Sequence, residues 1–155
     1  MADRPSERKL WRSLLAGFIY IALSSQAQAD AADDEFWPTL QQVFFAGKDV
    51  EDGSQLIQMT APAVAEDAGL VPISIAIDTF HSFVLQVAKI YLIIDANPVQ
   101  LTAIYHFPDN KQPIRFSTRV RLEKSTYVRA IVETRDGRYY LHKVAIKTPG
   151  GAVEA

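Results

Sequence analysis

The chain has 155 residues, a formal net charge of −2, 48% hydrophobic and 22% charged residues, and no cysteine. This length and composition fit one ordinary globular domain, and the mildly acidic net charge argues against nucleic-acid binding, in which basic residues must neutralise many phosphates. The absence of cysteine excludes disulfides, cysteine zinc sites, iron–sulfur clusters and thiol catalysis.

Residues 1–29 have the three-part pattern of a secretory signal peptide. Four basic residues precede a mostly apolar run at 13–23, and Ala27-Gln28-Ala29 supplies small residues for cleavage. The run is shorter than the roughly 20 residues of a membrane-spanning helix. We therefore expect cleavage after Ala29, export, and no stable membrane span afterwards, with an uncleaved anchor as the alternative. Residues 1–29 hold four basic and two acidic residues, so the mature chain that begins at residue 30 would carry a net charge of −4.

A polar leader at 30–35 precedes a predicted short helix that ends near Gly47. Apolar residues recur in this helix at helical spacing, and we expect them to face the core: Phe36, Leu40, Val43 and Phe44. An aromatic docking patch that includes Trp37 is the alternative interpretation of the same residues.

The periodicity then changes to that of strands. Residues 50–53 are expected to form a loop or turn, and Asp136-Gly137 a two-residue hairpin turn. Without a strand–helix–strand rhythm, the pattern predicts an all-β, immunoglobulin-like antiparallel β-sandwich over 36–148, with a short N-terminal helix and a tail at 149–155. The predicted strands cover 56–60, 70–77, 87–94, 101–107, 114–122, 128–133 and 138–147.

The strand predicted at 114–122 has an apolar face and a basic face. Arg115, Arg119 and Arg121 alternate with apolar residues, and Arg129 could join them from a neighbouring strand. Such a row can dock an acidic partner, since the guanidinium group makes two oriented hydrogen bonds. The alternative is a solvated face whose arginines pair with Glu123 or Glu133.

No motif for catalysis or metal binding is present. The histidines lack the close spacing of a metal-binding pair, although two of them could still meet across a sheet: His81, His106 and His142. No serine lies in a Gly-x-Ser-x-Gly elbow. We therefore expect no metal, no cofactor and no enzymatic activity. A cleft of clustered histidines and carboxylates would instead favour an independent hydrolase-type enzyme.

Seven short segments, in their order and spacing, resemble the SoxY family of sulfur carriers, from about residue 36 to residue 151. The segments are Phe36-Trp37-Pro38-Thr39-Leu40, Ala63 to Asp67 with Val71-Pro72-Ile73, Ile94 to Pro98, Thr118 to Arg121, Ala130 to Glu133, Asp136 to Tyr140, and Val144 to Lys147. The Trp-Pro opening and the Glu51-Asp52-Gly53 segment are most similar to a branch associated with quinoprotein dehydrogenases, in which a SoxY-like domain is fused to a SoxZ-like one.

The resemblance implies a periplasmic immunoglobulin-like domain that pairs with a SoxZ-like subunit and presents a glycine-containing C-terminal arm. In the family a Gly-Gly-Cys-Gly-Gly arm holds substrate on its cysteine, whereas Gly150 and Gly151 are followed here by Ala152. The resemblance therefore implies a non-covalent carrier or docking subunit that acts with a redox enzyme such as a quinoprotein dehydrogenase. A degenerate paralogue that regulates sulfur oxidation is the alternative.

Overall fold

The computed structural model describes residues 34, 36–77, 86–108 and 113–149. The chain forms two compact units, Met1–Pro38 and Thr39–Ala155. In the described part of the first unit, the Trp37 N–H donates to the Asp34 carbonyl at 3.1 Å. No helix in the described residues is long and apolar enough to cross a membrane. The predicted signal peptide and the tail from Gly150 onward lie outside the described residues.

Helix α2 spans Trp37–Phe45 and buries only two residues, Leu40 and Phe45. The Phe45 ring packs edge-on against Tyr91 at 5.3 Å and against Tyr139 at 5.6 Å, so aromatic rings of the sheet determine which helix face is buried. Gly47, at φ 70°, follows the helix as expected.

The expected core face of this helix was partly wrong. Phe36 and Val43 are 46% and 67% exposed, although their spacing suggested burial. A helix of nine residues contacts its sheet through few side chains, and Phe45 makes the contact expected of its neighbour Phe44.

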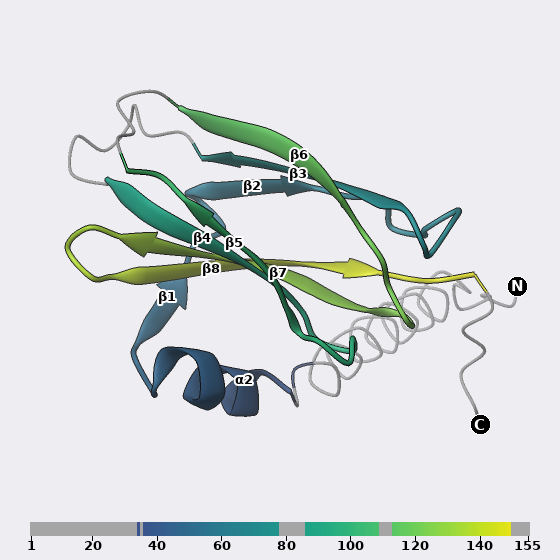
Figure 1. Cartoon of the computed structure of the whole chain (residues 1–155), viewed down its shortest axis with the longest axis horizontal. Helices are drawn as coiled ribbons and strands as arrows, with labels where there is room; N and C mark the ends of the chain where they lie inside the picture. Colours follow the sequence, from purple (N-terminus) through teal and green to yellow (C-terminus); the bar gives the residue numbers. More distant parts are fainter. Residues whose placement is uncertain (1–33, 35, 78–85, 109–112, 150–155) are drawn as a thin grey trace, which may run out of the picture. The chain divides into compact units, whose positions relative to one another are not determined.

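Two sheets form the second unit (Figure 1). One has five strands in the order β1-β8-β7-β4-β5, and the other has three in the order β2-β3-β6. The expected all-β sandwich is confirmed. The strands are β1 Val50–Asp52, β2 Ile57–Thr60, β3 Val71–Ile77, β4 Val87–Ile94, β5 Leu101–His106, β6 Ile114–Val120, β7 Thr126–Thr134 and β8 Tyr139–Ile146.

The hydrophobic core lies between the inner faces of the two sheets. Strand β3 alternates buried and more exposed residues along its length, as a strand with one covered face should. Strands β4 and β7 are buried over most of their residues, because they occupy the middle of the five-stranded sheet. The core residues include Ile73, Ile75, Ile90, Leu92, Val128 and Val132.

The sequence suggested a loop or turn at residues 50–53, and this expectation was wrong. Val50–Asp52 forms β1 and runs parallel to β8, with Val50 opposite Tyr139. The Gly53 N–H extends this pairing by donating to the Leu141 carbonyl at 2.7 Å. The hydrogen-bonding partner is almost 90 residues away in sequence, so local periodicity carried no signal for this strand. The other strand pairs are antiparallel, and Gly137 at φ 84° turns β7 into β8 as predicted.

Candidate functional site

The chain leaves the five-stranded sheet at residues 147–149, which we call the arm root. Lys147 donates its N–H to the Ala63 carbonyl at 2.9 Å and accepts from the Ala65 N–H at 2.8 Å. The Thr148 N–H donates to the Ser125 hydroxyl at 3.1 Å. The arm root is therefore held on two sides. The predicted arm residues Gly150, Gly151 and Ala152 follow it directly and lie outside the described residues.

A groove of about 340 Å³ lies beside the arm root, next to the segment that pairs with Lys147. Two exposed apolar residues line it, Val64 at 55% and Leu70 at 57% exposure, and two carboxylates, Glu66 and Asp67, lie among the lining residues. This combination of exposed apolar and acidic side chains was not apparent from the sequence.

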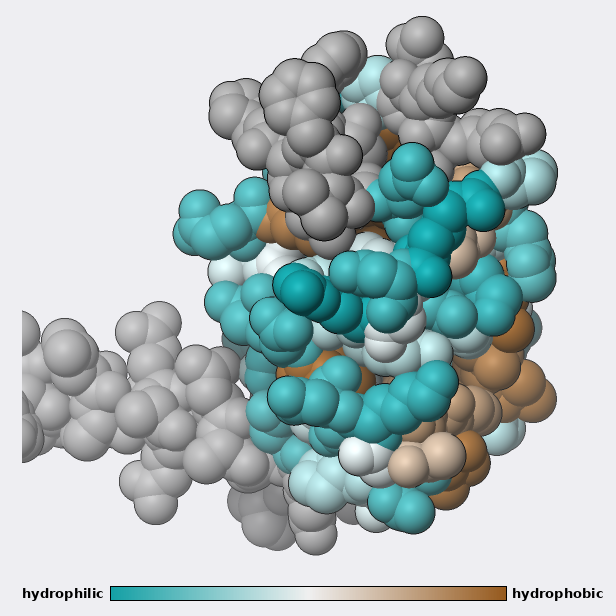
Figure 2. All heavy atoms as spheres, turned by 90° about the vertical axis from the view of Figure 1, so that its left-hand side faces the viewer, coloured by the Kyte–Doolittle hydropathy of each residue, from teal (hydrophilic) through white to brown (hydrophobic). Residues whose placement is uncertain are grey.

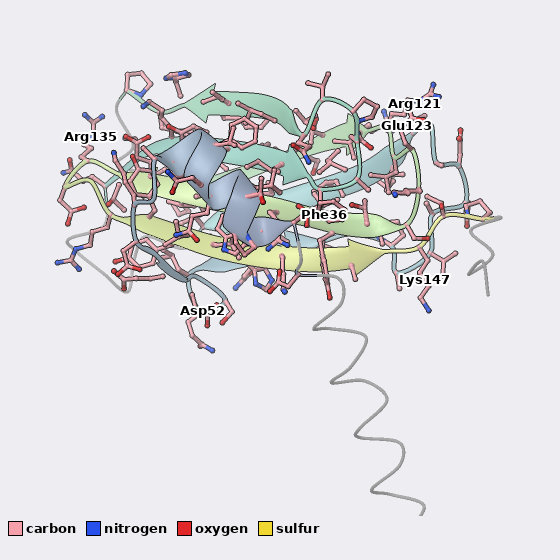
Figure 3. All side chains as sticks on the ribbon, turned by 90° about the horizontal axis from the view of Figure 1, so that it is seen from below. Phe36, Asp52, Arg121, Glu123, Arg135 and Lys147 are labelled. Atoms are coloured by element: carbon pink, nitrogen blue, oxygen red, sulfur yellow. The ribbon has the colours of Figure 1, made fainter. Side chains whose placement is uncertain are left out.

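Asn97 ties two loops together at the same end of the sandwich. Its side-chain amide donates to the Arg121 carbonyl at 2.8 Å and accepts from the Glu123 N–H at 3.1 Å. The Arg121 Nε and a Glu123 carboxylate oxygen are 3.0 Å apart, and the two residues lie close together in Figure 3, at the same end as Lys147. Arg121 therefore pairs with Glu123, as the alternative interpretation of the arginine row predicted. It lies just beyond the end of β6.

Arg115 and Arg119 occupy the outer face of the three-stranded sheet. Both are exposed, and neither forms an ion pair with another described residue. Between them the Ser117 hydroxyl lies 2.8 Å from that of Ser74 on β3. A shallow depression of about 370 Å³ adjoins this row, lined by Gln58, Thr60, Ser74, Ala76, Arg115 and Ser117 among others.

Arg129 does not belong to this basic row, so the suggestion that it could join the row was wrong. It lies on β7 of the other sheet and is 1% exposed. Its Nε lies 2.8 Å and its Nη2 2.7 Å from the carboxylate oxygens of Asp95, in a bidentate ion pair. The buried Asp95 supplies the charge that lets a guanidinium group remain away from water.

The Asp95–Arg129 pair also holds the turn that carries Asn97. Asp95 follows β4 directly, and its carbonyl accepts from the Gln100 side chain at 3.0 Å. The next residue, Ala96, donates its N–H to the Thr126 hydroxyl at 3.0 Å. A buried pair thus supports an exposed loop. Sequence reasoning recognised the turn at 95–98 but missed the pair, because no local pattern links positions 34 residues apart.

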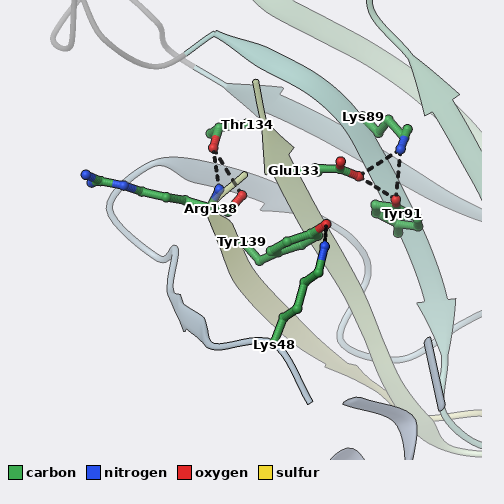
Figure 4. Close-up of polar contacts among 7 residues, drawn as sticks. All are labelled: Lys48, Lys89, Tyr91, Glu133, Thr134, Arg138 and Tyr139. Carbon is green, nitrogen blue, oxygen red and sulfur yellow. Dashed lines mark hydrogen bonds and ion pairs between the residues drawn. The ribbon is translucent and has the colours of Figure 1, made fainter. Parts of the chain in front are cut away.

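Glu133 belongs to a second polar cluster on the five-stranded sheet, not to the arginine row (Figure 4). One of its carboxylate oxygens accepts from Lys89 Nζ at 3.0 Å and from the Tyr91 hydroxyl at 2.5 Å. Burial acts to raise the pKa of Glu133, but the hydrogen bonds from Tyr91 and Lys89 outweigh it and lower the pKa. The bond to Glu133, with a second to Tyr91, raises the pKa of Lys89.

The described histidines do not meet. His106 ends β5 and His142 lies in β8, with β4 and β7 between these strands. Adjacent strands lie about 4.8 Å apart, so the two side chains are too far apart to share a metal ion. No group of three or more candidate metal ligands occurs in the described residues, and His81 lies outside them.

Comparison with known proteins decides the family. The family model of the sulfur oxidation protein SoxY matches residues 41–152, which is most of the chain. The chain belongs to the SoxY family. Its fold is similar to that of the sulfur carrier protein SoxY from Chlorobium limicola f thiosulfatophilum, with a TM-score of 0.61 and 20% identity over 76% of this chain and 96% of that one.

A superoxide reductase (neelaredoxin) variant from Ignicoccus hospitalis is also similar, with a TM-score of 0.50 and 13% identity over 60% of this chain and 79% of that one. Identities this low show a shared fold and nothing further about chemistry. No curated protein sequence matches the chain.

Membership of the SoxY family makes the end of the chain informative. The family match continues past the arm root and through both glycines to Ala152. The matched region therefore includes residues 149–152 of the tail, yet the chain contains no cysteine.

Proposed function

We propose that this protein is a periplasmic SoxY-like binding subunit that docks to a SoxZ-like partner and presents its tail to a redox enzyme, such as a quinoprotein dehydrogenase, without carrying substrate covalently. One observation carries the proposal: the family match extends to Ala152, beyond a firmly anchored arm root, in a chain without a thiol. The fold and the arm root support a scaffold role, and the missing thiol limits the chemistry.

The absence of cysteine restricts what the tail can do. A thiolate is the sulfur nucleophile that proteins use for covalent attachment, and the alanine methyl group has nothing to ionise. Gly150, Gly151 and Ala152 together add little bulk, so such a tail suits entry into a narrow site of a larger protein. We therefore assign Gly150, Gly151 and Ala152 a docking role.

Docking to an acidic partner is assigned to the row of Arg115, Arg119 and Arg121. Arg115 and Arg119 support this role because they are exposed and no described carboxylate neutralises them. Arg121 already pairs with Glu123, and that ion pair is exposed enough to exchange for another at little cost.

The first test is isolation of the tagged protein from the periplasm of its own cell, with mass spectrometry of what accompanies it. We expect stoichiometric recovery of a SoxZ-like subunit and an N-terminus at Asp30. Recovery of the protein alone under gentle conditions would remove the docking proposal and leave the family and fold.

Charge reversal tests the docking row. The double variant R115E/R119E should bind the recovered partner at least about tenfold more weakly, and the binding of the unaltered protein should weaken with added salt. The control is R135E, since Arg135 is also exposed but follows β7 of the other sheet. Equal loss in both variants would contradict a local role of Arg115 and Arg119.

The variant A152C tests whether the tail still reaches sulfur chemistry. Recovered from sulfur-oxidising cells, A152C should gain mass from bound sulfur species, while the unaltered chain should not. An unmodified A152C would mean that the tail no longer visits the enzymes that load the family's carriers.

The missing cysteine also favours a second candidate, a regulatory paralogue that occupies the partner of a true carrier. Overproduction of the chain should then slow thiosulfate oxidation by the cell. An unchanged oxidation rate, with the SoxZ-like partner fully bound, would exclude this candidate.

A further inference from the structure

The outer face of the three-stranded sheet is basic, although the chain as a whole is mildly acidic. Burial alternates along β2, β3 and β6, so every second residue of these strands points away from the core. The outward residues include no acidic and no aromatic side chain, and they are Gln58, Thr60, Pro72, Ser74, Ala76, Arg115, Ser117 and Arg119. This face therefore carries positive charge alone, and it has no ring on which a planar ligand could stack.

One row of residues across this face has a short side chain in its middle. Ala76 on β3 lies opposite Gln58 on β2 and opposite Arg115 on β6. Adjacent strands are about 4.8 Å apart, so the backbones of Gln58 and Arg115 are separated by about 10 Å. The methyl group of Ala76 fills little of the space between the two long side chains, and all three residues line the depression of about 370 Å³. The depression thus has a low floor and hydrogen-bond donors on two sides.

The neighbouring row adds hydroxyl groups to the same depression. Thr60, Ser74 and Ser117 lie opposite one another across the three strands, and all of them line it. The hydroxyl oxygens of Ser74 and Ser117 are 2.8 Å apart, so one of the two O–H groups forms the bond between them. Each hydroxyl group has one hydrogen to donate, so the serine pair keeps a second O–H that can donate to a ligand.

Most of the polar groups around the depression are unused donors. In the described part of the chain, the Gln58 amide and the Thr60 hydroxyl have no hydrogen-bond partner, and Arg115 has no ion pair. The guanidinium group brings a full charge and five N–H donors, and the amide brings two more. Such a set favours a ligand that accepts hydrogen bonds on several sides. A tetrahedral dianion does so with four oxygens, whereas the carboxylate of a partner protein offers two.

We propose that this depression binds a small tetrahedral dianion of the sulfate or phosphate class, without a covalent bond. Arg115 supplies the charge, and the hydroxyl row and the Gln58 amide supply neutral hydrogen bonds. The inference goes beyond the docking role of the arginine row, and it predicts that the dianion and an acidic partner compete for Arg115. Because the site is open to water, we expect salt to weaken the binding.

The experiment titrates the purified chain, without any partner, with sodium sulfate while sodium chloride holds the ionic strength constant. Nuclear magnetic resonance of the nitrogen-15-labelled chain follows each backbone amide. We expect saturable shifts confined to β2, β3 and β6, and largest around Ala76 and Arg115. A titration with sodium phosphate decides which member of the class binds more tightly, and one with sodium acetate measures how well a carboxylate replaces it. No partner is present, so the result is independent of the docking proposal.

Two variants and a control locate the site. R115Q should weaken sulfate binding at least about tenfold, because it removes a charged hydrogen-bond donor. A76V raises the floor of the depression without changing any charge, and it should weaken binding as well. The control R135Q makes the same substitution on the other sheet, at the end of the sandwich where Figure 2 shows mainly hydrophilic residues, and it should leave binding unchanged. The amide spectra also establish that each variant folds.

Four results would overturn the inference. Shifts that rise linearly with sulfate and spread over all basic residues would mean general attraction to positive charge. Equal weakening in R115Q and R135Q would mean the same. Unchanged binding in A76V would show that the depression is not the site. Acetate binding as tight as that of sulfate would assign these donors to the carboxylates of an acidic partner, which would leave the docking proposal intact.

Discussion

The outer faces of the two sheets use charge in opposite ways. On the five-stranded sheet Arg129 is buried against Asp95, and Lys89 and Tyr91 converge on Glu133. On the three-stranded sheet Arg115 and Arg119 are exposed, and no described carboxylate pairs with them. The same residue type thus serves stability where it is buried and paired, and is available to a partner where it is exposed.

The comparison also shows why an arginine cannot be assigned a role from strand alternation alone. Arg129 lies between Val128 and Ala130, and Arg119 lies between Thr118 and Val120, so both alternate with residues that are uncharged. Only the surroundings of each strand separate them, because one outer face is buried at this position and the other meets water.

The largest expected effect is loss of the buried ion pair. R129A should lower the free energy of unfolding by about 3–5 kcal/mol, because Asp95 would remain as a buried, unpaired charge. Chemical denaturation measures this, and the double variant R129M/D95L should recover much of the loss. A change below about 0.5 kcal/mol is the size expected of a surface substitution. Such a result would contradict the claim that the buried arginine stabilises the fold more than the exposed arginines do.

A close contact at the edge of the five-stranded sheet gives the next effect. In G53A the added Cβ would lie 2.9 Å from Ile57 Cδ1 and 3.1 Å from the backbone of Leu141. We expect a loss of about 1–3 kcal/mol, as for an overpacked core. In the comparison variant G137A the Cβ has no atom within 4 Å, so only the φ of +84° opposes it, at about 1–2 kcal/mol. A larger loss of stability in G137A than in G53A would show that the close contacts at Gly53 cost less than the positive φ at Gly137.

Acid should weaken the Glu133 cluster. The pKa of Glu133 is lowered in the folded protein, so its contribution is complete above the ordinary glutamate pKa of about 4.3 and is lost as pH falls through the folded value. E133Q should cost about 1 kcal/mol at neutral pH and flatten the dependence of stability on pH below that point. Parallel pH profiles for E133Q and the unaltered chain would mean that Glu133 does not contribute.

The smallest effect is expected on the three-stranded sheet. R115A/R119A should change the free energy of unfolding by less than about 0.5 kcal/mol, because neither side chain is paired or buried. Thermal unfolding measures this, with R129A as the sensitive reference. A loss comparable to that of R129A would reveal a structural role that the exposed positions of Arg115 and Arg119 do not suggest.

Much of the fold followed from period-two patterns. The strand predicted at 87–94 has the bounds Val87–Ile94, and the predicted two faces of 114–122 are confirmed over Ile114–Val120. Helix α2 and β1 were harder to predict from the sequence, because each depends on contacts with a distant segment of the chain. Phe45 is buried by Tyr91 and Tyr139, and Val50–Asp52 is a strand only because β8 lies beside it.

The candidate site divides in the same way. The sequence pointed to Gly150, Gly151 and Ala152 through a resemblance, and to Arg115, Arg119 and Arg121 through alternation. The sequence could not predict the surroundings of these residues, since the hydrogen bonds of Lys147 with Ala63 and Ala65 join segments more than 80 residues apart. The groove lined by Val64 and Leu70 depends on how those segments fold back.

By itself the sequence determined the SoxY family, the all-β class and the absence of a thiol, because these depend on residue identity and local period. Tertiary structure alone decided which arginine is buried and which histidines stay apart. Burial and pairing are set by chain segments that are distant in sequence, and a local pattern contains no information about them.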